Sequence, residues 1–299
     1  MKAGFVTLIG KPNVGKSTLL NHIVGQKVSI VSNKAQTTRR RLLGIATTED
    51  YQIIFIDTPG VHEAHTQLGK LLNETAEQAL GDTDLILAVV DVSRKPDRED
   101  DAIATMIARS RPSGTGPKVL LCMNKMDLLK PHHVQENVDE YLKLFDPADY
   151  MMTTMTRGHN ADKLIELIIA NLPESELLFP ADDITDMPMR VMAAEIIREK
   201  ALQLTREEVP HALATVVDTW EETEGGLTRI SASIVVEKDG QKAILIGKKG
   251  AMLKRIGTEA RLEIESWTGT RVFLELFVKV RTDWRQNPRM LRDLEILTG

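Results

Sequence analysis

The sequence predicts a mostly parallel α/β domain with helices on both faces of its sheet, followed by a smaller α+β domain. Over roughly the first 170 residues, short β-branched apolar runs alternate with longer amphipathic stretches, a pattern that favours parallel strands joined by helices. An acidic stretch containing prolines then breaks the periodicity. Beyond it the order changes to a helix, two strands, two helical stretches and a strand, which indicates a second fold.

Length and composition are those of a globular protein with room for two cores. The chain has 299 residues, 42% of them hydrophobic and 27% charged. No apolar run approaches the roughly 18 residues that a membrane span requires. The apolar start at residues 1–9 is too short for a secretory signal and is expected to be a strand. The single cysteine, Cys122, excludes an internal disulfide and lies in an apolar run, which favours a buried structural thiol and a cytosolic protein.

The first domain is expected over residues 1–172. Its strands are predicted at residues 4–9, 42–47, 52–57, 85–91, 119–124 and 150–154. Its helices are predicted at residues 18–24, 68–80, 98–108, 134–145 and 162–172. The strand candidates are short apolar runs, and the helix candidates are longer and amphipathic.

A linker is expected at residues 173–187, because prolines and acidic residues there interrupt every pattern. The second domain is then expected over residues 188–299. Its predicted elements are a helix at 190–204, strands at 212–221 and 227–238, helical stretches at 243–246, 250–257 and 258–267, a strand at 271–280 and a terminal helix from about residue 287.

Charge is distributed unevenly along the chain. The whole sequence carries a net charge of −5, but residues 241–290 hold eleven basic and five acidic residues, whereas residues 182–240 hold six basic and thirteen acidic ones. A basic segment inside an acidic protein suggests a local site for a polyanion. A solvated helix face would give the same charge run, so charge alone does not decide.

A phosphate-binding loop is indicated by residues 10–17, which fit the pattern G-x-x-x-x-G-K-[ST] between a predicted strand and a predicted helix. Glycines let backbone N–H groups turn toward phosphate oxygens, and the helix N-terminus adds positive potential. Lys16 is expected to reach the β- and γ-phosphates, and the Ser17 hydroxyl to bind Mg²⁺. The candidate binding residues here are Gly10, Asn13, Val14, Gly15, Lys16, Ser17 and Thr18.

A second motif, Asp57-Thr58-Pro59-Gly60, follows the apolar run at 53–56. A carboxylate at the end of a buried strand is well placed to hold Mg²⁺, and the Gly60 N–H can detect a γ-phosphate. An isolated aspartate at a strand end is more commonly a turn former or a helix cap.

A third motif, Asn124-Lys125-Met126-Asp127, closes the strand at 119–124. The Asp127 carboxylate can accept two hydrogen bonds from guanine, whereas adenine offers neither donor there. Asn124 would brace the loop, and the stem of Lys125 would cover the base. A capped turn is the alternative, but three motifs in this order at strand ends predict a site for GTP.

Together these motifs resemble those of translation-factor-type GTPases, and residues 34–39, KAQTTR, resemble the first switch of the Era-type GTPases. The resemblance implies a P-loop GTPase domain in which Thr38, rather than Thr37, approaches Mg²⁺ and the γ-phosphate. The implied metal ligands are Ser17, Thr38 and Asp57, and the implied catalytic residues are Lys16, Thr38 and Gly60.

The sequence departs from related GTPases at two places, and a third position suggests a hypothesis about a cation. Val61 stands where many small GTPases have a glutamine that orients water, and Era-like GTPases share an apolar residue here, which implies slow intrinsic hydrolysis. Thr154 and Met155 replace the family's Ser-Ala contact with the base, where a backbone N–H can still reach guanine. Asn13 occupies the position at which potassium-stimulated relatives hold a cation, so activation by K⁺ is a hypothesis.

An RNA-binding loop is indicated by Gly247-Lys248-Lys249-Gly250, a G-x-x-G turn between apolar, helix-compatible segments. The glycines allow close approach of the backbone to nucleotides, and the lysines supply charge, as in the KH fold. A plain helix–helix turn is the alternative. The element order resembles a type II KH domain, and the candidate RNA-binding residues are Ile244, Ile246, Gly247, Lys248, Lys249, Gly250, Lys254 and Arg255.

The resemblance to the Era family extends over nearly the whole chain, through residues 179–186, 195–200 and 278–281 with Trp284. It implies binding of small-subunit (16S) ribosomal RNA near its 3′ end and a role in maturation of the small (30S) subunit. It also implies peripheral association with the inner membrane, for which the sequence offers no strong amphipathic anchor. Nothing in the sequence requires a dimer, so a monomer is favoured. Two alternatives stay open: a C-terminal domain that docks to a protein or membrane, and an RNA-binding factor whose nucleotide site is structural.

Overall fold

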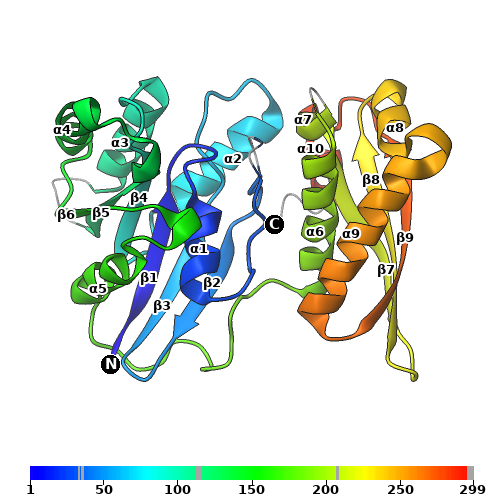
Figure 1. Cartoon of the computed structure of the whole chain (residues 1–299), viewed down its shortest axis with the longest axis horizontal. Helices are drawn as coiled ribbons and strands as arrows, with labels where there is room; N and C mark the ends of the chain where they lie inside the picture. The colour runs from blue at the N-terminus through cyan, green and yellow to red at the C-terminus, as the bar shows by residue number, and fades with distance from the viewer. Residues whose placement is uncertain (33, 35–36, 112–115, 207–208, 295–299) are drawn as a thin grey trace. The chain divides into compact units, whose positions relative to one another are not determined.

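The computed structural model describes residues 1–32, 34, 37–111, 116–206 and 209–294. The chain forms two compact units, and it leaves the first for the second between Asp186 and Met187. Each unit has its own sheet, six-stranded in the first and three-stranded in the second (Figure 1).

The first unit is a doubly covered, mostly parallel sheet. Its strands are β1 (Lys2–Ile9), β2 (Leu42–Thr47), β3 (Tyr51–Asp57), β4 (Leu85–Asp91), β5 (Lys118–Asn124) and β6 (Asp149–Met152). Their order is β2-β3-β1-β4-β5-β6, with β2 antiparallel to β3 and every other neighbouring pair parallel. Its helices are α1 (Lys16–Val24), α2 (Gln67–Gln78), α3 (Arg98–Ser110), α4 (Val134–Phe145) and α5 (Ala161–Asn171).

Apolar residues on both faces of this sheet are buried, as nearly continuous apolar strands require. On one face, residues of α2, α3 and α4 form a cluster with alternate residues of β4 and β5. On the opposite face α1 lies so close to β2 that a Cβ at Gly44 would be 2.5 Å from the side chain of Leu20. The predicted α/β class is therefore confirmed.

The second unit is an α+β arrangement built on a three-stranded sheet. Strands β7 (Ala214–Glu222) and β8 (Leu227–Val236) are antiparallel, and β9 (Arg271–Val280) runs parallel to β8. The helices are α6 (Met189–Leu204), α7 (Val209–Ala212), α8 (Asp239–Ile246), α9 (Ala251–Thr268) and α10 (Pro288–Asp293). Helices α6 and α9 pack on each other and against the sheet (Figure 1). This is the predicted KH arrangement.

Several predicted boundaries were wrong. The helix predicted at 243–246 begins at Asp239, and the strand predicted to reach residue 238 ends at Val236. The strand predicted to reach Thr154 ends at Met152, because Thr154 pairs with His159 in a tight turn. The strand predicted from Ala212 begins at Ala214, since Ala212 ends a short helix whose last carbonyl accepts the indole N–H of Trp284. The helical stretches 250–257 and 258–267 form the single helix α9.

Residues 173–186, most of the predicted linker, lie against the first unit. The backbone N–H of Ile45 donates to the carbonyl of Ile184 at 2.9 Å, and the N–H of Leu43 donates to the Asp186 carboxylate at 2.8 Å. These bonds, with an isolated bridge between Gly44 and Thr185, place residues 184–186 along β2. We call residues 184–186 the edge segment.

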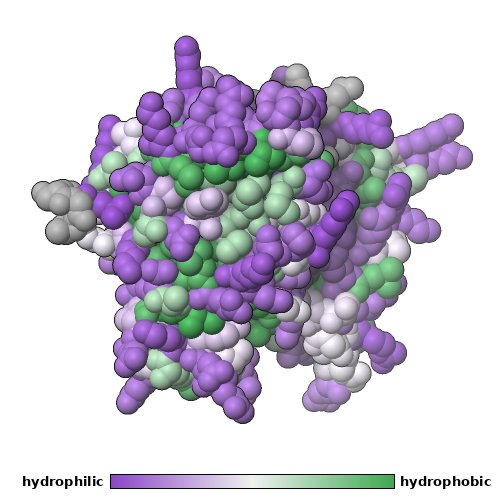
Figure 2. Space-filling view, turned by 60° about the vertical axis from the view of Figure 1, so that its left-hand side comes forward, coloured by the Kyte–Doolittle hydropathy of each residue, from purple (hydrophilic) through white to green (hydrophobic). Residues whose placement is uncertain are grey.

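No helix in the described part of the chain is long and apolar enough to cross a membrane. On the face shown in Figure 2, hydrophobic side chains form separate patches among hydrophilic ones.

Candidate nucleotide and RNA sites

The three predicted nucleotide motifs meet at the carboxyl edge of the first sheet. The loop of residues 10–15 follows β1, Asp57 ends β3, and Asn124 ends β5. Strand β1 lies between β3 and β4. The later strands are therefore on both sides of β1, with β3 on one side and β4 and β5 on the other. Ligands of open α/β sheets bind at such a switch point.

The phosphate loop has a backbone that its sequence makes possible. Asn13 and Gly15 adopt positive φ angles of 63° and 108°, a region in which glycine and asparagine are favoured. A Cβ at Gly10 would lie 2.2 Å from the carbonyl oxygen of Val89, and one at Gly15 would lie 2.3 Å from Nδ2 of Asn124. Both glycines are therefore required by close packing.

The ammonium of Lys16 caps this loop. Its Nζ donates to the carbonyl oxygens of Gly10 at 2.9 Å and Lys11 at 3.1 Å. The residue is 6% exposed, and burial lowers the pKa of its ammonium to about 8, although the charge of Asp57 opposes this. Within the described part of the chain, this buried ammonium bonds to carbonyl oxygens alone, and it can exchange one of them for a phosphate oxygen.

The three predicted metal ligands lie together. The Ser17 Oγ and Thr38 Oγ1 atoms are 3.0 Å apart, and both hydroxyls donate to Oδ2 of Asp57, at 3.1 and 3.5 Å. Asp57 is fully buried, and its Oδ1 atom has no hydrogen-bond partner among the described residues. Burial raises the pKa of this carboxyl, and the charge of Lys16 opposes the shift. Mg²⁺ prefers oxygen ligands, and two hydroxyl oxygens lie here beside a carboxylate whose Oδ1 has no hydrogen bond to any described residue. These three side chains therefore suit a bound Mg²⁺.

The Gly60 segment lies against the phosphate loop. A Cβ at Gly60 would be 2.6 Å from the backbone nitrogen of Pro12, and the N–H of Val61 donates to the Gly10 carbonyl at 3.2 Å. Val61 is buried and apolar, so its side chain offers no hydrogen bond to water. Beside it, Nδ1 of His62 lies 3.0 Å from the Gly60 carbonyl oxygen.

The other residues of this loop system have clear structural places. The Thr58 hydroxyl donates to the Leu8 carbonyl at 2.6 Å, while Pro59 and Val14 are buried and Thr18 is half-buried in α1. In the first-switch segment, Thr38 is buried. Ala35 and Gln36, which contributed to the family resemblance, lie outside the described residues.

Asn124 joins the phosphate loop to the segment after β6. Its Nδ2 donates to the Val14 carbonyl at 2.8 Å, and its Oδ1 accepts from the Met155 N–H at 3.0 Å and from the Thr153 hydroxyl at 3.2 Å. The bracing role predicted for Asn124 thus has a geometric basis. Thr153 was not predicted, because a buried threonine after a strand carries no motif of its own.

The remaining base-site candidates frame one end of the sheet. Lys125 has a φ of 63°, and its Nζ forms an ion pair with Asp91 at 2.8 Å. Asp127 lies exposed in the short helix Met126–Leu128. Thr154 and Met155 are buried. The exposed carboxylate of Asp127 is therefore accessible to the edge of a base.

The G-x-x-G turn lies between α8 and α9. Gly247 and Gly250 have φ angles of 70° and 78°, and Lys249, with a φ of 53°, is also left-handed. Lys248 and Lys249 are exposed, as are Lys254 and Arg255 on the first turns of α9. Ile244 is 51% exposed and Ile246 is half-buried. The predicted lysine and arginine side chains are therefore exposed to solvent, and the two isoleucine side chains are at least partly exposed.

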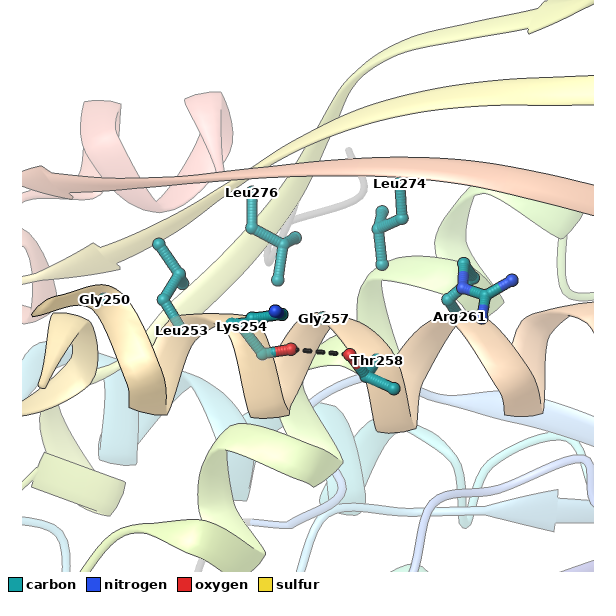
Figure 3. A pocket seen from close by; sticks show the side chains of 8 residues that line it. All are labelled: Gly250, Leu253, Lys254, Gly257, Thr258, Arg261, Leu274 and Leu276. Carbon is teal, nitrogen blue, oxygen red and sulfur yellow. Dashed lines mark hydrogen bonds between the residues drawn. The ribbon is translucent and has the colours of Figure 1, made fainter.

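A groove runs from this turn along α9 and β9 (Figure 3). It has a volume of about 380 Å³. Its lining residues are Gly250, Leu253, Lys254, Gly257, Thr258, Arg261, Leu274 and Leu276. Figure 3 shows the two leucines of β9 pointing toward the helix, with Arg261 at the far end. Only two of these residues were predicted, because the leucines have the alternating pattern of an ordinary strand.

Both units resemble known protein families. A family model described as "50S ribosome-binding GTPase" matches residues 5–125, and one described as "KH domain" matches residues 208–285. The chain is 47% identical to the GTPase Era of Geobacter metallireducens, over 98% of this chain and 97% of the relative. It is 43% identical to the GTPase Era of Heliobacterium modesticaldum, over 98% and 96%.

Solved structures agree with the whole fold. An Era variant from Aquifex aeolicus bound to GDP·AlF4⁻ matches with a TM-score of 0.92 at 41% identity, over 100% of both chains. An Era in complex with MgGDPNP and nucleotides 1506–1542 of 16S ribosomal RNA matches with a TM-score of 0.93 at 41% identity, also over 100% of both chains. The identity over nearly the full length, together with both family models, shows that this chain belongs to the Era family of GTPases.

Proposed function

We propose that the protein is a GTP-hydrolysing switch that binds the 3′ region of small-subunit ribosomal RNA through its C-terminal unit and assists maturation of the small subunit. The proposal rests mainly on one solved relative, an Era in complex with MgGDPNP and nucleotides of 16S ribosomal RNA. Its whole chain matches this one at 41% identity. The convergence of Ser17, Thr38 and Asp57 supports the same assignment.

The hydrolysis site works by positioning and electrostatics. Ser17, Thr38 and Asp57 would hold Mg²⁺, which when bound neutralises charge on the β- and γ-phosphates. Lys16 would exchange the carbonyls of Gly10 and Lys11 for phosphate oxygens. The N–H of Gly60, which packs against the loop, would meet the γ-phosphate. Because Val61 cannot orient water, we propose slow turnover in the absence of a partner.

The base site would select guanine through hydrogen bonds to the edge of the base. Asp127 would accept from the base N1–H and exocyclic amine. The N–H of Met155 donates to Oδ1 of Asn124 at 3.0 Å in this structure, and it would share or exchange that bond for one to O6. Adenine would leave the Asp127 carboxylate without these two donors, which lowers its binding free energy relative to guanine. Met155 stands where the family has a small residue, but a contact made by the backbone N–H does not depend on the side chain.

The RNA site combines charge with an apolar groove. Lys248, Lys249, Lys254 and Arg255 would contact phosphates from one end of α9. Leu274 and Leu276 give the groove wall an apolar surface against which bases can pack. We propose direct phosphate contact, so RNA affinity is expected to fall steeply with salt.

We also propose a path that couples the two sites. GTP would order the segment around Thr38, which precedes β2 by only a few residues. The first residues of β2 hold the edge segment through Leu43 and Asp186, and Asp186 is the last residue of the first unit. A shift of β2 would therefore reach the start of the second unit. We expect Asp186→Ala to reduce the difference in RNA affinity between the GTP and GDP states without abolishing either binding activity.

Three finer assignments accompany the proposal. A potassium ion beside Asn13 would assist turnover. The protein would act as a monomer in the cytosol, with part of it bound peripherally to the inner membrane. Equilibrium sedimentation and cell fractionation test the last two.

The test is binding of a 3′-terminal fragment of small-subunit ribosomal RNA, in the presence of a GTP analogue or of GDP. Three proteins are compared: wild type, Gly247→Asp and Gly225→Asp. Gly225 lies in the β7–β8 turn with nothing within 4 Å of a Cβ, so it controls for the added charge. A double variant, Lys248→Glu with Lys249→Glu, tests the same loop through exposed side chains.

We expect tight binding by wild type and Gly225→Asp with the analogue, weaker binding with GDP, and loss in Gly247→Asp and in the lysine double variant. Weak binding by wild type in both states would contradict the RNA assignment and favour a protein or membrane partner. Absence of any GTP turnover, with and without RNA, would favour a structural nucleotide site.

A further inference from the structure

Ser29 lies outside every nucleotide motif of the sequence, yet it contacts the metal-site carboxylate. Its hydroxyl donates to Oδ2 of Asp57 at 3.0 Å. Ser29 is 2% exposed and Asp57 is fully buried. A hydrogen bond to a buried carboxylate is among the stronger ones in a protein, so this contact helps to set the orientation of Asp57.

The position of Ser29 is fixed by a second residue, Asn21 of α1. Oδ1 of Asn21 accepts from the backbone N–H groups of Val28 and Ser29, each at 2.9 Å, and its Nδ2 donates to the Ser29 carbonyl at 2.6 Å. Asn21 stands four residues after Ser17 and therefore on the same face of the helix. One helix thus places both the Ser17 hydroxyl and the backbone that presents Ser29.

Three hydroxyls converge on Asp57, but they are not equivalent. Ser17 and Thr38 are the candidate Mg²⁺ ligands, so their oxygens would turn toward the cation. Ser29 belongs to no candidate metal set, so its hydroxyl is free of that role and would keep its bond to Oδ2 when the cation binds. Ser29 would then continue to hold Oδ2 while Oδ1, which has no hydrogen-bond partner among the described residues, stays open to another ligand.

The surroundings of Ser29 keep this bond dry. Val28 is fully buried and Ile30 is 2% exposed, so apolar side chains flank Ser29 on both sides along the chain. A hydrogen bond that water cannot replace retains more of its strength. Removal of the hydroxyl would leave Asp57 free to rotate or to require another donor.

We propose that Ser29, held by Asn21, is a positioning residue for Asp57, and that the pair sets the affinity of the site for Mg²⁺ and hence the lifetime of bound GDP. The inference rests on the proposed guanine-nucleotide site. It assigns a function to the segment between α1 and the first switch.

The experiment measures release of a fluorescent GDP analogue from the full chain across a Mg²⁺ titration, with one series in EDTA. Wild type, Ser29→Ala and Ser29→Thr are compared. The matched control is Ser233→Ala, which removes another fully buried serine hydroxyl that donates to a carboxylate, that of Asp218, in the second unit. Thermal unfolding of each variant accompanies the kinetics.

In Ser29→Ala, the Mg²⁺ concentration that half-maximally slows release is expected to rise about three- to tenfold, since a hydrogen bond to a charged group is lost. The release rate in EDTA should stay at the wild-type value, and Ser29→Thr should restore the wild-type titration. Asn21→Ala should raise the midpoint similarly, and the double variant should add little, because the two residues act as one unit.

An unchanged Mg²⁺ midpoint in Ser29→Ala would overturn the proposal. So would release that is equally accelerated in Mg²⁺ and in EDTA, because it would mean that the serine supports the loop and not the metal site. Failure of the wild type to bind GDP, by contrast, would overturn the proposed function itself.

Discussion

The side chain of Asn124 holds the phosphate loop from the end of a strand 110 residues further along the chain, by donating to the carbonyl oxygen of Val14 at 2.8 Å. The same side chain accepts the N–H of Met155 at 3.0 Å. The phosphate end and the base end of the nucleotide site are therefore fixed to each other by one amide.

Asn124→Ala should lower GDP affinity about ten- to a hundredfold, because buried partners left unpaired cost about 1–3 kcal/mol. Fluorescence titration with a labelled GDP measures this. Asn171→Ala, which removes an amide at the far end of α5, should bind like wild type. Equal affinity in the two variants would contradict the bracing role.

Asp127→Asn should exchange the base preference of the site. An amide presents a donor where guanine also has a donor, so GTP affinity should fall by more than about tenfold. Xanthine carries a carbonyl at that position, so xanthosine triphosphate should gain affinity. Competition between the two nucleotides for each protein tests this, and an unchanged preference would argue against contact of Asp127 with the base.

The ion pair between Asp91 and Lys125 predicts a pH-dependent stability term. Burial by itself raises the pKa of Asp91, but the hydrogen bond and charge of Lys125, together with hydrogen bonds from Ser93, outweigh it, so the pKa lies below its usual value. A lowered folded-state pKa stabilises the fold above the unfolded pKa of about 4 and loses that contribution as pH falls through the folded value.

Asp91→Asn should therefore be less stable than wild type at pH 7, by about 1–3 kcal/mol, and the gap should narrow below about pH 4. Urea unfolding across that range measures it. The control is Asp139→Asn, which changes an exposed carboxylate of α4. A gap that does not depend on pH would mean that packing, not charge, is lost.

Cys122 should be unreactive in the folded protein. Burial raises the pKa of its thiol to about 12, and the nearby Thr153 hydroxyl only partly opposes this. Iodoacetamide at pH 8 should leave the native thiol unmodified while labelling free glutathione in the same tube, and should label the protein fully in urea. Mass spectrometry reports both. Rapid labelling of native protein would show that β5 opens readily.

Turnover should be faster in KCl than in NaCl at equal ionic strength if a potassium ion lies beside Asn13. Asn13→Ala should then remove the difference between the salts without abolishing GDP binding. Single-turnover rates with saturating protein separate this effect from nucleotide release. Equal rates of wild type in both salts would remove potassium from the mechanism.

The sequence predicted those parts of the candidate site that carry motifs. Asp57 and Asn124 end strands, and Lys16 follows the loop after another strand. The carboxyl ends of parallel strands meet at one edge of a sheet. For such residues, local pattern and tertiary position coincide. The order of elements in the second unit was also predicted correctly, because each element there has a recognisable local pattern.

The sequence did not reveal the residues that act through partners distant along the chain. Ser29 meets Asp57 28 residues away, and Thr153 meets Asn124 29 residues away. Serine and threonine in a polar or buried stretch have no distinctive spacing, so only the folded geometry selects them. Leu274 and Leu276 follow the period of a strand, which predicts their face but not that part of it stays open as a groove.

The edge segment has a consequence for how the first unit could be isolated. Strand β2 ends the sheet order, and edge strands with open N–H groups invite pairing with another chain. A fragment ending at residue 172 would expose the N–H groups of Leu43 and Ile45 and would lose the ring contact between Phe5 and Phe179. Such a fragment should self-associate and aggregate at concentrations where a fragment ending at residue 186 stays monomeric.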